Sequence, residues 1–171
     1  MRNTNPSQAV SRMPQSQTVR RRISPAVFVL IVLHMILGLG AIGGGVMLIA
    51  DPSGEKMGMP LSILERTFFP SYLIPGILLL LVFGVLPLLV AYALRRQPNW
   101  PIAEAVNPYR GELHPVWALS LYVGFGQIIW IMVQTYMMNA VAAVHLGYTA
   151  LGLLILIVTL LPAVRTYCLN G

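Results

Sequence analysis

Four long runs of apolar residues, each free of charged side chains, divide the chain: residues 25–50, 73–94, 115–138 and 140–164. Each run has about 22 to 26 residues, enough for an α-helix to cross a hydrocarbon core about 30 Å thick. Apolar and polar positions do not alternate within the runs, as they would in a membrane β-barrel. Because backbone groups in lipid need partners within their own segment, the pattern predicts an all-α membrane protein with four transmembrane helices in an antiparallel bundle.

The composition agrees with this prediction. Of the 171 residues, 57% are hydrophobic and only 9% are charged, whereas a soluble domain carries about 25% charged residues. All of the 11 Lys and Arg except Lys56 and Arg66 fall in the N-terminal segment, between residues 95 and 110, or at Arg165. The positive-inside rule therefore predicts that both termini are cytoplasmic. The net charge of +6 reflects this topology, and we do not expect nucleic-acid binding.

Residues 1–24 are rich in Ser, Gln, Asn and Pro and poor in large apolar side chains. Such a segment cannot bury enough apolar surface to fold alone, so we expect a disordered basic cytoplasmic tail ahead of a transmembrane domain of residues 25–171. Arg20, Arg21 and Arg22 directly precede the first span, where they act as a topology signal beside the lipid headgroups. That span is too long for a cleaved signal peptide, and we expect it to remain as an anchor.

The two longer connections differ in character. Residues 51–72 form the predicted outer loop, for which we expect a short helix or a partly ordered segment at the membrane interface. A lid over the bundle is an alternative role for this loop. Residues 95–114 form the cytoplasmic loop, whose internal prolines predict an extended connector. Pro87 predicts a bend within the second span.

A glycine-rich stretch, GLGAIGGG, occupies residues 38–45 of the first span. Its first six residues match the G-x-G-x-x-G pattern of dinucleotide-binding loops, but that pattern belongs to a turn between a strand and a soluble helix. Inside an apolar span, small residues one turn apart let a second helix approach closely. We therefore expect the glycines of three spans to be helix-packing residues: Gly38, Gly40, Gly43, Gly44, Gly45, Gly124 and Gly152.

Polar side chains inside the spans are the first place to look for function, because they are costly in hydrocarbon. Gln127 and Gln134 share one stripe of the third span, and His145 and Thr149 share one of the fourth. Since the turn between these spans is tight near Asn139, Gln134 is expected at the depth of His145 and Thr149, close enough to hydrogen-bond directly. Polar contacts that hold helices together and a functional site are both open interpretations.

His34 completes this candidate polar cluster, about 13 Å into the first span at 1.5 Å per residue. Haem ligation by His34 and His145 needs both imidazoles at one depth, whereas we expect a separation of about 10 Å along the membrane normal. We predict a neutral His34 bonded to a neighbouring helix, no metal site and no cofactor, with haem or quinone as the alternative. Cys168 is the single cysteine, so neither an intrachain disulfide nor a cysteine metal cluster can form.

Two stretches carry a resemblance: LIADPSGEKMGMPLSILERTFFPSYLIPG, which three further spans follow, and GQIIWIMVQ in the third span. With them the chain resembles small four-helix bacterial membrane proteins over about residues 25–167. It is also similar in size and helix count to the DoxX-like proteins, some of which are associated with quinol oxidation. The resemblance implies a location in a bacterial plasma membrane.

No apolar run contains Asp, Glu, Lys or Arg, and neither H-E-x-x-H nor G-x-S-x-G occurs. A carboxylate proton relay and hydrolysis are therefore unsupported, and enzymatic activity stays open without being the expectation. We predict a multi-pass membrane protein acting as an accessory or structural subunit, which packs against another membrane protein or a second copy of itself. The alternatives are a DoxX-like redox or quinone-interacting protein and a carrier or channel for a small neutral solute.

Overall fold

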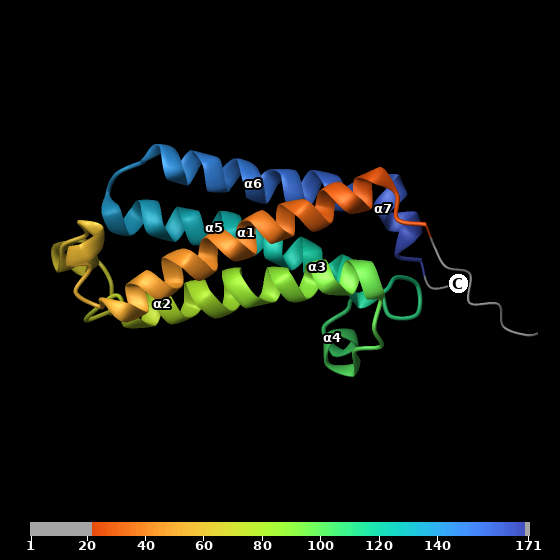
Figure 1. Ribbon diagram of the computed structural model, residues 1–171, viewed down its shortest axis with the longest axis horizontal. Helices are drawn as coiled ribbons and strands as arrows, with labels where there is room; N and C mark the ends of the chain where they lie inside the picture. The colour runs from red at the N-terminus through yellow and green to blue at the C-terminus, as the bar shows by residue number, and fades with distance from the viewer. Residues whose placement is uncertain (1–21, 170–171) are drawn as a thin grey trace, which may run out of the picture.

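The computed structural model describes residues 22–169, and its long segments are helical (Figure 1). Four helices are long and apolar enough to cross a membrane: Pro25–Ala50, Leu73–Arg96, Pro115–Met138 and Ala143–Leu160. The prediction of an all-helical chain with four apolar spans is confirmed for the described residues. Of the predicted tail, residues 1–21, with Arg20 and Arg21, lie outside them, and Arg22 is exposed just before the first helix.

The first span is α1 (Pro25–Ala50), an uninterrupted helix of 26 residues. The Ser24 hydroxyl accepts the backbone N–H of Val27 at 3.3 Å, which satisfies one of the donors left over at a helix start. Pro25 stands at the beginning of the helix, where the missing N–H of proline leaves no intrahelical bond unmade. The helix ends directly before an Asp-Pro pair, so local sequence sets both of its ends.

The second span consists of three segments that continue one another: α2 (Leu73–Leu78), the π-helix η5 (Leu79–Val85) and α3 (Leu86–Arg96). Pro87, at which we predict a bend, lies two residues after this π-helix. Proline has no N–H to donate, so the hydrogen-bond ladder before it has to rearrange. The backbone N–H that follows η5 donates instead to the Leu81 carbonyl, five residues back.

The fourth apolar run is divided into two helices, α6 (Ala143–Leu160) and α7 (Pro162–Tyr167). The structure thus differs at both ends from the predicted single span of residues 140–164. At the start, Asn139 has φ 48° and adopts the left-handed conformation that ends the preceding helix. At the other end, Pro162 cannot continue α6 and begins a new helix instead.

The long helices run between two ends of the molecule (Figure 1). One end, here the distal end, holds the 51–72 segment and the turn between α5 (Pro115–Met138) and α6. The other, here the terminal end, holds α7, the 97–114 segment and both ends of the described chain. α1 packs against the second span and α6, and α5 packs against α6. The bundle therefore has α1 and α5 as neighbours of α6.

Both long connections contain short helices. The 51–72 segment holds two 3₁₀ turns, η3 (Glu55–Met57) and η4 (Leu61–Leu64), consistent with the predicted short ordered segment. The 97–114 segment holds α4 (Pro101–Ala105), where we predicted an extended connector. The reason for this difference is positional, since proline favours a helix when it occupies the first position.

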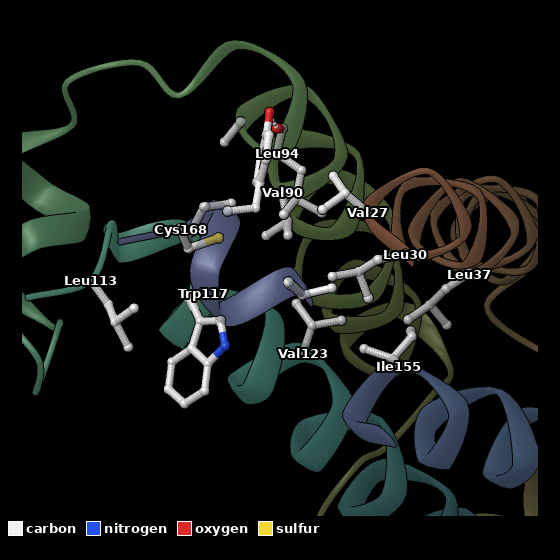
Figure 2. Close-up of a cluster of buried hydrophobic side chains, with 14 residues drawn as sticks. Val27, Leu30, Leu37, Val90, Leu94, Leu113, Trp117, Val123, Ile155 and Cys168 are labelled. Atoms are coloured by element: carbon white, nitrogen blue, oxygen red, sulfur yellow. Dashed lines mark hydrogen bonds between the residues drawn. The ribbon is translucent and has the colours of Figure 1, made fainter. Parts of the chain in front are cut away.

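The main apolar core lies in the terminal half, where α1, α3, α5, α6 and α7 meet (Figure 2). Leu30, Val90 and Ile155 are fully buried there. The Tyr167 hydroxyl of α7 donates to the Leu94 carbonyl at 2.9 Å and joins the last helix to the second span. This half of the bundle is consequently closely packed.

The distal half buries fewer apolar side chains. Its cluster consists of Leu48, Leu64, Tyr72 and Met137. The Tyr72 hydroxyl donates to the Pro60 carbonyl at 3.2 Å within the 51–72 segment, and Leu64 and Tyr72 pack this segment against α1 and α5. Beneath this segment the helices leave the space described next.

Candidate functional site

A chain of hydrogen bonds joins three helices in the middle of the bundle. His34 of α1 is fully buried, and its Nδ1 donates to the Leu30 carbonyl at 2.9 Å, because a carbonyl can only accept. Its Nε2 lies 3.4 Å from the Ser120 hydroxyl of α5, which lies 2.7 Å from the Thr159 hydroxyl of α6. Trp117 Nε1 donates to the Thr159 carbonyl at 3.0 Å. Each side chain has a partner, so this network connects α1, α5 and α6.

A cavity of about 280 Å³, here the distal cavity, lies between α1, α5 and α6. Most of its wall is apolar. Leu37, Leu79 and Ile131 contribute from the helices, and Met57 and Met59 contribute from the 51–72 segment. A concave apolar wall with a few polar groups is the usual form of a small-molecule site.

Five side chains with polar atoms also line the distal cavity: Gln127, Trp130, Gln134, His145 and Tyr148. Gln127 is only 2% exposed, and its Oε1 has no hydrogen-bond partner within residues 22–169. The buried Nε1–H of Trp130 lacks a partner in the same part of the chain. Leaving a buried polar atom unpaired costs about 1–3 kcal/mol. Such atoms are rare in native structures, so two beside one cavity need a physical explanation.

Two of the three residues predicted to bond across α5 and α6, His145 and Thr149, make local hydrogen bonds at and within α6 instead. His145 lies in the first turn of α6, where backbone N–H groups lack intrahelical acceptors, and its Nδ1 accepts one of them at 3.1 Å. Thr149 donates to the His145 carbonyl at 2.8 Å, within its own helix. Gln127, Gln134 and His145 line the distal cavity together, whereas Thr149 is not among its lining residues and His34 belongs to the separate network. The distal cavity therefore brings together three of the five predicted residues, while Thr149 and His34 lie elsewhere.

Close helix contacts involve four of the predicted packing glycines. A Cβ atom on Gly38 would stand 2.9 Å from the Gly84 carbonyl oxygen, and one on Gly45 would stand 2.8 Å from a backbone nitrogen of the second span. A Cβ atom on Gly124 would be 3.3 Å from the Gly152 carbonyl oxygen, and the reverse distance is the same. At these positions the helix backbones approach closely, which only glycine permits without displacement.

The other three glycines have different surroundings. Gly40 and Gly44 line the distal cavity. A Cβ atom on Gly40 would collide with the Tyr148 hydroxyl, while one on Gly44 would meet the flexible end of Leu79 at 3.2 Å. Around Gly43, no atom of the described chain beyond the local helix lies within 4 Å of such a Cβ. Gly43 is exposed and faces outward, unlike its neighbours.

Tyr148, Met57 and Met59 are cavity residues that sequence reasoning missed. Tyr148 lies three residues after His145 on the same helix, so helical spacing could have placed both on one face. Met57 and Met59 come from an irregular segment and carry no periodic signal. The cavity lining includes exposed residues, among them Gly40 and Met57. They place the mouth of the cavity beside α1 and under the 51–72 segment.

The two histidines of the apolar spans lie in different surroundings, since His34 belongs to the Ser120–Thr159 network whereas His145 lines the distal cavity. Each uses a ring nitrogen in a local hydrogen bond, His34 with Leu30 and His145 with the backbone at the start of α6. Among the residues that the structure describes, no three His, Cys, Asp or Glu side chains lie close enough to hold a metal ion.

Titratable groups outside the spans stabilise the connections. Asp51 accepts the Ser53 hydroxyl at 2.6 Å and the Lys56 backbone N–H at 2.7 Å, and these bonds lower the pKa of its carboxyl. At the terminal end, burial lowers the pKa of His114, whose Nε2 lies 3.2 Å from the Pro98 carbonyl. Neither Asp51 nor His114 is among the lining residues of the distal cavity.

Comparisons of the chain with protein-family models, with curated proteins and with solved structures found no match. A functional interpretation therefore has to come from the geometry of the site.

Proposed function

We propose that the four long helices span a bacterial plasma membrane as an antiparallel bundle, with the terminal end in the cytoplasm. Their length and apolar composition support this placement. Basic residues support the orientation, because the cytoplasmic flanks of membrane proteins carry an excess of Lys and Arg. Lys56 and Arg66 belong to the distal connection, and the other basic residues of the described chain belong to the terminal end: Arg22, Arg95, Arg96, Arg110 and Arg165.

We propose further that the protein binds a small, uncharged, lipid-soluble molecule in the distal cavity. The observation that carries this proposal is the unpaired, buried Oε1 of Gln127 at a cavity of about 280 Å³. A glutamine that only joins helices would bond to one of them, as Ser120 does in the network beside it. A glutamine that receives a ligand keeps its amide unpaired until the ligand arrives.

The lining indicates the charge and the origin of the molecule. No Asp, Glu, Lys or Arg contributes to the distal cavity. A charged ligand would therefore be desolvated without a counter-charge, which is strongly unfavourable. Since the cavity lies within the apolar part of the bundle, a neutral ligand can reach it from the lipid phase. The quinone-interacting hypothesis requires such a bound molecule, so it is a special case of this proposal.

The test uses two glycine-to-leucine variants of the full chain, at adjacent positions of α1. Gly44→Leu places a side chain beside the flexible end of Leu79 and fills part of the cavity, whereas Gly43→Leu adds the same side chain to an open outer surface. Each protein is extracted from its own membrane in a mild detergent and studied by native mass spectrometry. We expect a retained small molecule with the wild type and Gly43→Leu, and its loss with Gly44→Leu. Retention of nothing by the wild type would overturn the proposal.

The same pair of variants tests the accessory-subunit hypothesis. Its structural support is confined to Gly43 of α1 and Gly147 of α6, where a Cβ atom would meet nothing of the described chain within 4 Å. Such bare backbone on a lipid-facing surface suits a second transmembrane helix. An accessory subunit should lose a co-purified protein, or its own oligomer, in Gly43→Leu and keep it in Gly44→Leu.

A further inference from the structure

The two unpaired atoms at the distal cavity are chemically complementary. Gln127 Oε1 can only accept a hydrogen bond and Trp130 Nε1–H can only donate one. They lie three residues apart on α5, hence on one face of the helix, and yet no hydrogen bond joins them. A group that donates to the first atom and accepts from the second would satisfy both.

A hydroxyl group meets both requirements with one oxygen. A hydrocarbon would leave both protein atoms unpaired, and a ketone or an ether would offer an acceptor to Trp130 but no donor to Gln127. The Gln127 amide is the end of a side chain with three rotatable bonds, so its rotation can bring Oε1 to a ligand beside Trp130. A water molecule has the same capacity, but among organic ligands with a single oxygen the hydrogen-bond inventory favours an alcohol or a phenol.

The remaining lining favours an aromatic ring next to that hydroxyl. The indole of Trp130 and the phenol of Tyr148 line the cavity, together with the thioethers of Met57, Met59 and Met138. Aromatic rings pack favourably on one another and on methionine sulfur. An engineered apolar cavity of about 150 Å³ holds benzene, so about 280 Å³ accommodates one ring with a short substituent. The exposed Gly40 at the mouth leaves a path for a longer chain toward lipid.

We propose that the ligand of the distal cavity is a neutral phenol with a hydrocarbon substituent, whose hydroxyl donates to Gln127 Oε1 and accepts from Trp130 Nε1–H. This inference rests on the proposed function, since it names the class of molecule that the cavity binds. It also makes Gln127 the residue that distinguishes a hydroxyl from other groups of the same size.

The test compares two probes that differ in one substitution, the replacement of the hydroxyl proton by a methyl group. Purified full-length protein in detergent is titrated with 4-butylphenol and with its methyl ether, 4-butylanisole, by isothermal calorimetry. We expect the phenol to bind about tenfold more tightly, the effect of one hydrogen bond to a buried acceptor. Gln127→Met should abolish this preference and still bind the ether. Trp130→Phe should weaken the binding of both probes, and Gly43→Leu should leave the affinity for each probe unchanged.

The outcomes separate this inference from the proposed function. Equal affinity of the wild type for both probes would overturn the phenol assignment and leave a cavity that binds neutral molecules. Failure of both probes, together with a retained molecule of another class in native mass spectrometry, would also overturn the phenol assignment alone. Failure of both probes with nothing retained would remove the proposed function as well.

Discussion

Replacing Gln127 with methionine tests whether the distal cavity is built for a ligand or for stability. Methionine has a similar length and no branch, so it preserves the stem of the side chain. That stem is packed, since a Cβ atom on Gly152 would lie 3.3 Å from Gln127 Cγ. The substitution removes an amide oxygen that has no partner within residues 22–169. Its effect on folding should therefore report the cost of that unpaired oxygen.

The expected increase in stability is unusual for a substitution at a buried position. An unsatisfied buried polar atom costs about 1–3 kcal/mol, and methionine relieves this cost without opening a cavity. We expect the ligand-free Gln127→Met protein to have a free energy of unfolding about 1–3 kcal/mol higher than the wild type. Most core substitutions lower stability instead.

Ser120→Ala is the matched control on the same helix, seven residues earlier. It removes a hydroxyl that lies 2.7 Å from Thr159 and 3.4 Å from His34. Loss of these bonds leaves the His34 ring nitrogen without a donor and should lower the free energy of unfolding by about 1–3 kcal/mol. The two variants are thus expected to shift stability in opposite directions.

The assay is reversible unfolding of the purified protein in mixed micelles with increasing SDS, followed by circular dichroism after removal of bound small molecules. A Gln127→Met protein less stable than the wild type by about 1 kcal/mol or more would show that Gln127 is already paired in the free protein. That result would refute the argument for a ligand at this residue.

Three further predictions concern packing, pH and the distal connection. Gly45→Ala should lower the free energy of unfolding by about 1–3 kcal/mol, because the added methyl group meets the backbone of the second span. Gly43→Ala should leave the free energy of unfolding unchanged or raise it by up to about 1 kcal/mol. Unfolding in SDS compares the two variants. Because burial lowers the pKa of His114 in the folded state, the unfolded state binds more protons. The contribution of His114 to stability is therefore complete above about pH 6.5 and is lost as the pH drops toward the folded pKa. Melting scans from pH 8 to 5 should show this loss of stability, and His114→Asn should reduce the loss. Tyr72→Phe removes the 3.2 Å hydrogen bond to Pro60 and should speed proteolysis of the 51–72 segment, with a stability loss of about 1 kcal/mol.

The sequence alone determined the four apolar helices, because length and hydropathy are properties of each segment taken separately. Three of the four spans have nearly the predicted bounds, since local features such as Ser24, Pro25 and Asn139 set where helices start and stop. The fourth span was predicted too long, because the apolar run continues through the break before Pro162. Hydropathy does not detect a break in a helix when the residues on both sides of the break are equally apolar.

The tertiary structure decided which polar and small residues share a site. Periodicity placed Gln127 and Gln134 on one stripe, but only the packing of α1 with α5 and α6 assigned His34 to a hydrogen-bond network and the glutamines to the distal cavity. Adjacent glycines also received opposite roles: Gly43 faces outward, while Gly44 lines the cavity. These outcomes depend on the rotation of each helix about its axis. Rotation is set by contacts between segments distant in sequence, which no local pattern contains.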